Sequence, residues 1–402
     1  MGRTTRGRRE PHLPKVERVE LSDSHVKGRL AVTVLLLLAG VALIVFSIMK
    51  LFRVDAGWQE IEADAAGEPN CGGDFSFLYE LGREGISANA EKKGVTSVYS
   101  DAAKTAYEIF NTDVEIDGVA NLWYINHHPN EEISVDEALY NAFFRLQEDG
   151  GRFIYLGPAY SVYDNLFYMT SPEVAYDFDP YLNPYIGNLF REICEFADDP
   201  AAVDLELLEN NVVKLNVSPE YLAFAAEEEL EDFIDFYWLK NAFVVDYMAE
   251  RLLTAGYTRG VLSSYDGFVR CLDGSGTEFT YQLYHLQGDS TVVSEHLNYS
   301  GPQSFVTLKS YPLSSLDLKH YLILPDGSVR TPYLSPVDGL DLCCMEELTA
   351  YSQAAGCAEI TLKIAPIYIA DKLKESTLST LAEAGIYTVY WRDGGVVSDG
   401  PL

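Results

Sequence analysis

The sequence predicts an α+β fold, in which one mixed domain follows a single N-terminal transmembrane helix. Hydrophobic residues make up 48% of the 402 residues and aromatic residues 12%, so most of the chain can bury a core. Helical and strand-like apolar patterns then interchange from residue 75 to residue 391. One long uncharged run stands apart from these patterns, near the N-terminus.

The uncharged run is Leu30–Met49, which has 20 residues. At 1.5 Å per residue a helix of this length covers about 30 Å, the thickness of a bilayer's hydrocarbon core. A buried core helix rarely lacks a polar face for so long. A cleaved signal peptide usually has a shorter apolar run followed at once by a small-residue cleavage site, and that site is missing here. We therefore expect residues 30–52 to be an uncleaved signal-anchor.

Charge predicts the orientation of this anchor. Eight Lys and Arg residues precede Leu30, so the positive-inside rule places residues 1–29 in the cytoplasm as a basic tail. Residues 53–70 are then a spacer and residues 71–402 an extracytoplasmic domain. The chain has a net charge of −32 and residues 1–53 carry +6, so the remainder is strongly acidic. An acidic domain excludes nucleic acid as the expected partner.

Cysteine and histidine do not form any recognised metal or catalytic pattern in the sequence. The six cysteines lack metal-site spacing, and an extracytoplasmic location permits disulfides without requiring them. We expect most cysteines to be buried apolar residues, with pairing left open. His127 and His128 are expected in a surface loop. The sequence contains no G-x-S-x-G, H-E-x-x-H or Walker motif.

The elements expected before residue 235 follow from apolar periodicity and from turn residues. They are a strand at Phe75–Tyr79, helices at Asp101–Phe110 and Val135–Leu146, a strand at Arg152–Leu156, a helix from Tyr163 to Met169, a strand at Val212–Leu215 and an acidic helix face at residues 225–234.

The stretch from Asp235 to Leu262 is the centre of the predicted domain. Apolar residues recur at helical spacing up to Leu253, and Gly256 ends the helix because glycine takes the left-handed cap without strain. Arg259–Leu262 is an expected strand leading to a turn at Asp266-Gly267. Unpaired N–H groups at the start of such a helix can bind a phosphate.

The elements expected after this stretch include two alternating strands and a mixed C-terminus. They are strands at Phe279–Leu286 and Ser304–Leu308, a helix that includes Glu346–Leu348, a strand at Ile360–Ile364, another helix, and a strand at Tyr387–Trp391.

Residues 235–246 resemble the flavin-binding core of the ApbE family, the FAD:protein FMN transferases, whose pattern is close to D-L-G-G-I-A-K-G-Y-A-V-D. Asp235 and Asp246 match its two ends. Tyr237-Trp238 replace its glycine pair, and Asn241 replaces its lysine. Tyr and Trp fill the space in which paired glycines let a ligand's phosphates approach the backbone. We therefore expect these two side chains to plug a flavin cradle.

Other segments resemble family motifs in the same order. Residues 178–184 match F-D-P and a later proline, which implies a structural crossing with Asp179 as a helix cap. Ser314–Asp317 stands where the family has T-S-G-D. Thr331–Gly339 stands where it has H-H-I-I-D-P-R-T-G, with Pro332, Ser335 and Asp338 in place of its His, Asp and Thr. Residues 370–375 resemble the start of its Mg²⁺-binding A-D-A-L-x-T, with Glu375 at the Thr.

The resemblance implies a domain of ApbE type over residues 71–402, and two alternative functions. The replaced residues favour a degenerate, non-catalytic relative, or pseudoenzyme, that acts in surface interaction or assembly with a protein partner outside the membrane. The alternative is an active transferase that moves FMN from FAD with Mg²⁺, using rebuilt metal ligands. The expected cofactor-site residues are Tyr237, Trp238, Asn241, Asp246, Ser314, Asp317 and Ser335, and the rebuilt metal ligands are Asp338, Asp371 and Glu375.

Overall fold

The structure is a computed structural model in which the chain divides into two compact units, Met1–Val54 and Asp55–Leu402. It describes residues 26–51, 54–63, 72–83, 85–149, 152–168, 175–288, 290–313, 320–392 and 394–400. The expected site residues Ser314 and Asp317 lie outside these ranges, as do Cys71 and Met169.

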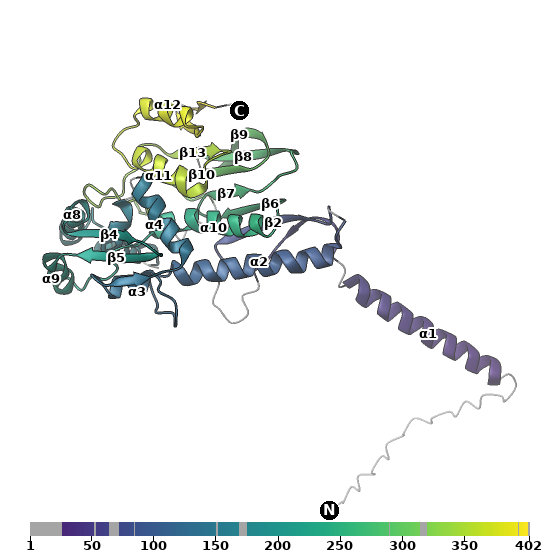
Figure 1. Cartoon of the computed structure of the whole chain (residues 1–402). Helices are drawn as coiled ribbons and strands as arrows, with labels where there is room; N and C mark the ends of the chain where they lie inside the picture. Colours follow the sequence, from purple (N-terminus) through teal and green to yellow (C-terminus); the bar gives the residue numbers. More distant parts are fainter. Residues whose placement is uncertain are drawn as a thin grey trace, which may run out of the picture. The chain divides into compact units, whose positions relative to one another are not determined.

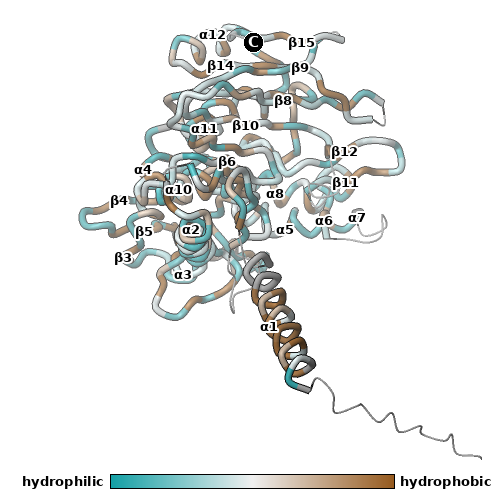
Figure 2. Tube along the Cα trace, turned by 90° about the vertical axis from the view of Figure 1, so that its right-hand side faces the viewer, coloured by the Kyte–Doolittle hydropathy of each residue, from teal (hydrophilic) through white to brown (hydrophobic). Residues whose placement is uncertain are grey.

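The first unit contains helix α1 (Val26–Leu51), which includes residues 30–51 of the predicted anchor. Its described side chains between Leu30 and Val45 are mostly apolar and exposed. In Figure 2 most of the α1 tube has the brown colour of hydrophobic residues. Within the residues that the structure describes, no helix is both long and apolar enough to span a membrane. The anchor therefore stays a prediction.

The second unit is built on a fully antiparallel main sheet (Figure 1). Its described strands, in order across the sheet, are β1 (Gly57–Glu60), β2 (Phe75–Leu81), β6 (Gly260–Ser264), β7 (Phe268–Cys271), β10 (Gln303–Lys309), β13 (Glu347–Ser352), β14 (Tyr387–Arg392) and β15 (Gly395–Ser398).

Both faces of this sheet are covered near its centre. On one face a hairpin of β8 (Glu278–Gln287) and β9 (Ser290–Ser300) packs through Leu283 and Leu297 into a buried cluster with Phe305. On the other face lie α10 (Lys240–Thr254) and α11 (Cys357–Tyr368), which contact β7, β10 and β13. All six residues of β13 are buried as a result.

Helix α2 (Ala88–Ile109) packs along α10 and is longer than predicted. The Ser87 side chain accepts a hydrogen bond from the backbone N–H of Ala90, so it caps the helix N-terminus. The buried residues Val95, Tyr99, Ala102 and Ala106 follow helical spacing. Helix α12 (Glu375–Glu383) lies near the C-terminus and contacts β14.

A smaller part of the domain contains a three-stranded sheet with the order β3-β5-β4. Short helices lead from this layer to the centre of the domain. The described elements of this part are α3 (Leu122–His127), β3 (Glu132–Ser134), α4 (Glu137–Asp149), the 3-10 helix η1 (Arg152–Leu156), α5 (Gly157–Tyr163), α6 (Asn165–Tyr168), α7 (Ala175–Phe178), α8 (Pro184–Asp198), β4 (Val203–Leu208), β5 (Val212–Val217), α9 (Pro219–Glu227), the 3-10 helix η2 (Tyr237–Leu239), and the two-stranded sheet of β11 (Leu322–Ile323) and β12 (Val329–Arg330).

The segment between α9 and η2 is held by a buried asparagine. The Asn126 side-chain amide donates to the Ile234 carbonyl oxygen at 2.9 Å and accepts from the Ile234 N–H at 3.0 Å. The Asp235 N–H donates to the Ile154 carbonyl oxygen at 2.8 Å. A Cβ atom on Gly157 would lie 1.8 Å from the Asp232 carbonyl oxygen, so α5 can approach this segment only with glycine there.

Most predicted elements are confirmed, but several assignments in buried segments are wrong. Arg152–Leu156 was predicted to be a strand but is a 3-10 helix. Its last four residues are all buried, so the segment lacks the alternation of buried and exposed residues that is typical of a strand. Ile360–Ile364 lies inside α11, where burial on nearly all sides overrides the strand preference of its β-branched residues.

Three further expectations need correction. Glu347 and Leu348 open strand β13, and the polar Glu347 is accommodated because its carboxylate accepts a hydrogen bond from the Tyr311 hydroxyl. His127 ends helix α3, with its ring stacked on Trp123. The acidic helix face was predicted at residues 225–234, but helix α9 ends at Glu227. The chain from 228 to 234 has irregular backbone.

The cysteine expectation is confirmed for Cys194, Cys271 and Cys357, which are buried. Cys343 and Cys344 are half-buried, and the five described cysteines are all unpaired.

Candidate functional site

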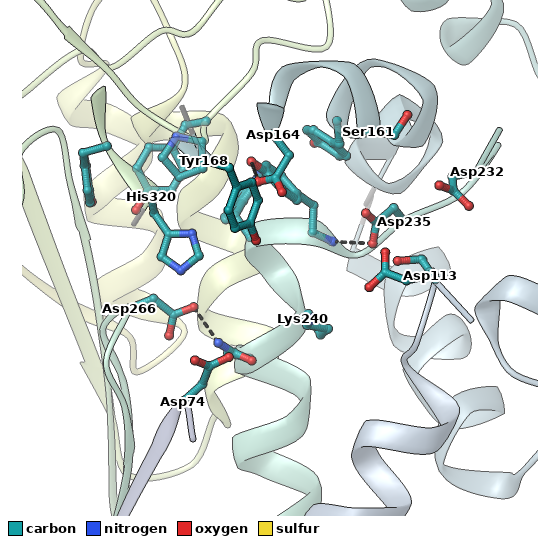
Figure 3. Close-up of a pocket in the computed structure, with 18 of the residues that line it drawn as sticks. Asp74, Asp113, Ser161, Asp164, Tyr168, Asp232, Asp235, Lys240, Asp266 and His320 are labelled. Carbon is teal, nitrogen blue, oxygen red and sulfur yellow. Dashed lines mark hydrogen bonds between the residues drawn. The ribbon is translucent and has the colours of Figure 1, made fainter. Parts of the chain in front are cut away.

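A cavity of about 310 Å³ lies where the start of α10 meets α5, α6, the β6–β7 turn and residues 320–333. Figure 3 shows the side chains that converge on it. Three of the expected cofactor-site residues, Tyr237, Trp238 and Asn241, line this central cavity together with Pro332. Its described walls combine six aspartates with a group of aromatic rings, among them Tyr160, Tyr168, Tyr237, Trp238, Tyr321 and Tyr333.

Tyr237 keeps a glycine-like backbone although it is a bulky residue. Its φ is +43°, in the left-handed region that glycine adopts without strain, and the resembled pattern has glycine at this position. The Asp235 side chain supports this turn by accepting from the Tyr237 N–H at 2.8 Å. The Tyr237 ring stacks on Tyr160 at 4.6 Å, and its hydroxyl donates to Asp164 Oδ1 at 2.8 Å. The ring therefore belongs to the cavity wall.

Trp238 forms a second part of the aromatic wall. It is 7% exposed and packs edge-on against Phe153 and Tyr333, with centroid distances of 5.8 Å and 5.1 Å. The Trp238 indole nitrogen and the Tyr160 hydroxyl are both buried and lack a well-formed hydrogen bond among the described residues, and Trp238 is close enough to lower the pKa of Tyr160 against the larger effect of burial. Buried polar atoms of this kind normally find a partner.

Six aspartates from different segments surround the cavity. In Figure 3, Asp113, Asp232 and Asp235 lie on one side, and Asp74 and Asp266 on the other with His320. Lys240 and Lys309 also line the cavity, so carboxylates outnumber lysines. The described walls thus carry an excess of negative charge.

Burial raises the pKa of three of these carboxyl groups. The pKa of Asp232 rises to about 7, through burial first and then through the charges of Asp235 and neighbouring acids. Burial raises the pKa of Asp235 to about 6, although its bond with the Tyr237 N–H and the charge of Lys240 act in the opposite direction. Burial also raises the pKa of Asp164, despite the Tyr237 hydroxyl.

Asn241, which replaces the family's lysine, hydrogen-bonds inside the cavity. Its side-chain amide donates to Asp266 Oδ2 at 2.8 Å. The other oxygen, Asp266 Oδ1, is buried and has no partner among the described residues. A lysine at position 241 would neutralise this carboxylate, whereas asparagine leaves its charge in place.

Asp246, expected to line the ligand site, instead caps a helix elsewhere in the domain. Its two carboxylate oxygens accept from the backbone N–H groups of Cys357 and Ala358, both at 2.9 Å, at the N-terminus of α11. Arg270 forms an ion pair with it at 3.1 Å. Gly356 leaves room for the carboxylate, since a Cβ there would lie 2.4 Å from Asp246 Oδ2. Asp246 is absent from the residues that line the central cavity.

Ser335 and Asp338 form a tight turn and do not line the cavity. The Ser335 side chain accepts from the Val337 N–H at 3.2 Å, and Asp338 Oδ1 accepts from the Leu340 N–H at 3.3 Å. Gly339 closes the turn with φ +71° and packs against Phe190.

The three residues expected as metal ligands are not brought together. Asp371 and Glu375 border a different hollow beside β14, where Glu375 pairs with Arg392. Within the described part of the chain, no three His, Cys, Asp or Glu side chains are grouped in a way that could hold a metal ion. Asp338, Asp371 and Glu375 therefore do not form one metal site in this structure.

The match around Asp179 has a structural role, but Asp179 is not the expected helix cap, because the Asn183 side chain caps α8 (Pro184–Asp198) by accepting from the Tyr185 N–H at 3.0 Å. Asp179 is fully buried, accepts from the Tyr181 N–H at 2.8 Å, and forms an ion pair with Arg330 at 2.9 Å. This pair joins α8's start to strand β12. Sequence reasoning missed the cavity residues Asp74, Asp113, Asp164 and Asp232, because no motif links them and only folding brings them together.

Comparison with solved structures shows the class of fold. The chain resembles the ApbE protein of Thermotoga maritima, with a TM-score of 0.55 and 15% identity over 85% of this chain and 96% of that one. It also resembles the flavin transferase ApbE of Vibrio cholerae, with a TM-score of 0.54 and 12% identity over 86% and 97%. No family model matches the chain, and no curated protein does. The domain therefore has the mixed α+β fold of ApbE flavin transferases, which confirms the resemblance at the level of the fold.

Proposed function

We propose that this chain is a membrane-anchored, extracytoplasmic protein of ApbE fold that does not transfer FMN and acts in recognition or assembly with a partner. One observation carries the proposal. Tyr237 and Trp238 occupy the positions of a glycine pair, and Tyr237 keeps the glycine-like φ of +43° while its ring forms part of the cavity wall. Side chains therefore take the space in which a phosphate would meet backbone N–H groups.

The charge of the cavity supports the same conclusion. FAD carries an anionic pyrophosphate, and binding it requires cationic groups or a metal ion to neutralise that charge. The cavity has six aspartates against two lysines, Lys240 and Lys309, and the neutral Asn241 stands at the position of the family's lysine. Asp338, Asp371 and Glu375 do not supply a joint metal site that would offset these carboxylates.

The membrane part of the proposal rests on the sequence. Leu30–Met49 is uncharged for 20 residues, and eight basic residues precede it. A helix of this composition favours an anchor with a cytoplasmic N-terminus. The strongly acidic remainder of the chain would then lie outside, exposed to other surface molecules.

Flavin binding tests the non-catalytic assignment. Purified chain is titrated into FAD with MgCl₂ and then incubated with a peptide acceptor that carries the family's target Thr. We expect little quenching of flavin fluorescence and no covalently flavinylated acceptor after gel electrophoresis. Saturable quenching, or a fluorescent acceptor band that disappears in Asp371→Ala, would refute the proposal and support a transferase with a rebuilt site.

Protease treatment of intact cells tests the orientation. We expect residues 71–402 to be degraded from outside while an N-terminal epitope tag survives. The matched control is the same treatment after cell lysis, which should remove both parts. Survival of the acidic domain in intact cells would contradict the proposed topology.

A further inference from the structure

The main sheet begins only a short length of chain after the proposed anchor. Helix α1 ends at Leu51, and strand β1 begins at Gly57, which is already paired with Leu81 of β2. A chain of six residues spans at most about 22 Å. With α1 inserted as an anchor, the start of β1 therefore cannot lie farther than this from the end of the membrane helix.

The loop between β2 and α2 lies at the same end of the sheet as the start of β1. A Cβ atom on Gly82, the first residue after β2, would lie 2.7 Å from the Cβ of Ala56. The Gly82 N–H donates to Glu91 Oε2 at 2.6 Å, which ties the start of this loop to α2. Ser87 caps α2 at the other end of the loop. The short connection to α1 thus limits the position of this loop and of the first turns of α2 as well.

Two large apolar side chains are exposed at this end of the domain. Trp58 of β1 is 43% exposed, and Ile86, the residue before the α2 cap, is 53% exposed. Gly85 precedes Ile86 with φ +76°, in the left-handed region that glycine adopts without strain. Tryptophan is favoured at the interface between membrane and water, and an exposed isoleucine gains free energy when it leaves water.

The same end also carries a pair of lysines. Lys92 and Lys93, in the second turn of α2, are the only adjacent Lys or Arg residues between positions 54 and 402, a stretch that is otherwise strongly acidic. Neither lysine forms an ion pair with another residue that the structure describes. Lysines placed in this way are attracted to anionic lipid headgroups.

Most of the acidic side chains described near this pair are engaged within the protein. Glu91 is 8% exposed and accepts from the Tyr79 hydroxyl at 3.2 Å as well as from the loop. Glu80 forms an ion pair with Arg83 at 2.6 Å. Asp55 is exposed. The two lysines are therefore not balanced by a matching set of exposed carboxylates in their immediate surroundings.

From these features we propose that Trp58, Ile86, Lys92 and Lys93, the corner patch, bind the surface of the bilayer in which α1 is anchored. The lysines meet anionic headgroups, and the two apolar side chains enter the headgroup region. The acidic remainder of the domain is repelled by the same headgroups, so the patch fixes which end of the domain faces the membrane. This inference rests on the membrane anchor of the proposed function.

Photochemical crosslinking of the full chain in lipid nanodiscs tests the contact. The photoreactive residue p-benzoylphenylalanine replaces Ile86 in one variant and Val337, which is 82% exposed and outside the patch, in the control. In nanodiscs of phosphatidylcholine and phosphatidylglycerol, we expect lipid adducts at position 86 and none at position 337, detected by mass spectrometry. Equal adducts at both positions, or crosslinks from position 86 to a second copy of the chain, would overturn the proposal.

Charge-matched variants test the role of the lysines. Lys92→Gln/Lys93→Gln removes the basic pair, and Lys372→Gln/Lys374→Gln removes two exposed lysines outside the patch. We expect the first change to lower the adduct yield at position 86 by at least about threefold and the second to leave it unchanged. Equal yields in both variants would mean that the lysines do not bind headgroups and would overturn the proposal. Circular dichroism shows that each variant is folded.

The same nanodiscs separate failure of this inference from failure of the proposed function. A chain that does not stay with the nanodisc during gel filtration lacks the anchor, and both proposals fall. A chain that stays with the nanodisc and gives no lipid adduct at position 86 keeps its anchor and loses the corner patch.

Discussion

Tyr237 combines a strained backbone with favourable side-chain contacts. A φ of +43° costs a non-glycine residue about 1 kcal/mol or more, and the cost is met by the surrounding structure. Here the compensation comes from the stacked Tyr160 ring and the hydrogen bond to Asp164. At Tyr237 the backbone conformation therefore lowers stability, while the side-chain contacts raise it.

Substitutions at Tyr237 should show both effects. Tyr237→Gly relieves the backbone but removes a ring that is buried in the cavity wall, so we expect a net loss of about 2 kcal/mol in the free energy of unfolding. Tyr237→Ala loses the ring and keeps the strain, so it should be less stable than Tyr237→Gly by about 1 kcal/mol. Urea unfolding measures both. An alanine variant as stable as the glycine variant would contradict the argument.

At the scale of elements, Asp246 joins α10, α11 and β7. It lies on α10, accepts from two N–H groups at the start of α11, and pairs with Arg270 of β7. Helix N-termini favour negative charge because their first N–H groups lack intrahelical partners. The match of Asp246 to the last Asp of the resembled pattern thus has a structural explanation in this chain.

Removal of this cap should loosen α11. Asp246→Ala leaves two backbone donors and Arg270 without their acceptor, so we expect a loss of about 3 kcal/mol in the free energy of unfolding. Amide hydrogen exchange should rise in residues 357–368. Asp246→Asn, which retains one acceptor oxygen, should lose about half as much. Unchanged exchange in α11 with reduced stability elsewhere would refute this role.

At the scale of the whole molecule, the acidic charge and the burial of some carboxyl groups determine how stability depends on pH. The chain has a net charge of −32, and the pKa values of Asp232 and Asp235 are raised to about 7 and about 6. Their ordinary value is 3.8. Between these values the folded state binds more protons than the unfolded state, so the free energy of unfolding falls as pH rises.

The folded chain should therefore be more stable in mild acid than in mild base. We expect the free energy of unfolding to decrease by about 2 kcal/mol between about pH 5 and about pH 8. Denaturant unfolding at a series of pH values measures this slope. The Asp232→Asn/Asp235→Asn variant should show a flatter profile, because its side chains do not titrate. A profile that rises with pH in the parent chain would contradict the assignment.

The sequence by itself determined the elements whose pattern is local. Strand Phe75–Tyr79, the α10 periodicity with its Gly256 stop, and strand Tyr387–Trp391 all appear in the structure. The resemblance at Asp235–Asp246 also indicated the correct fold, and Tyr237 has a positive φ where the resembled pattern has glycine.

Only the tertiary structure decided which residues line the cavity and whether the buried segments are helices or strands. Arg152–Leu156 and Ile360–Ile364 are surrounded by other elements, and burial on all sides removes the periodicity that separates helix from strand. Asp246 and Asp164 are both ordinary aspartates in the sequence, yet one caps α11 and the other lines the cavity. Which role each takes depends on contacts between residues far apart in the chain, and such contacts leave no local pattern.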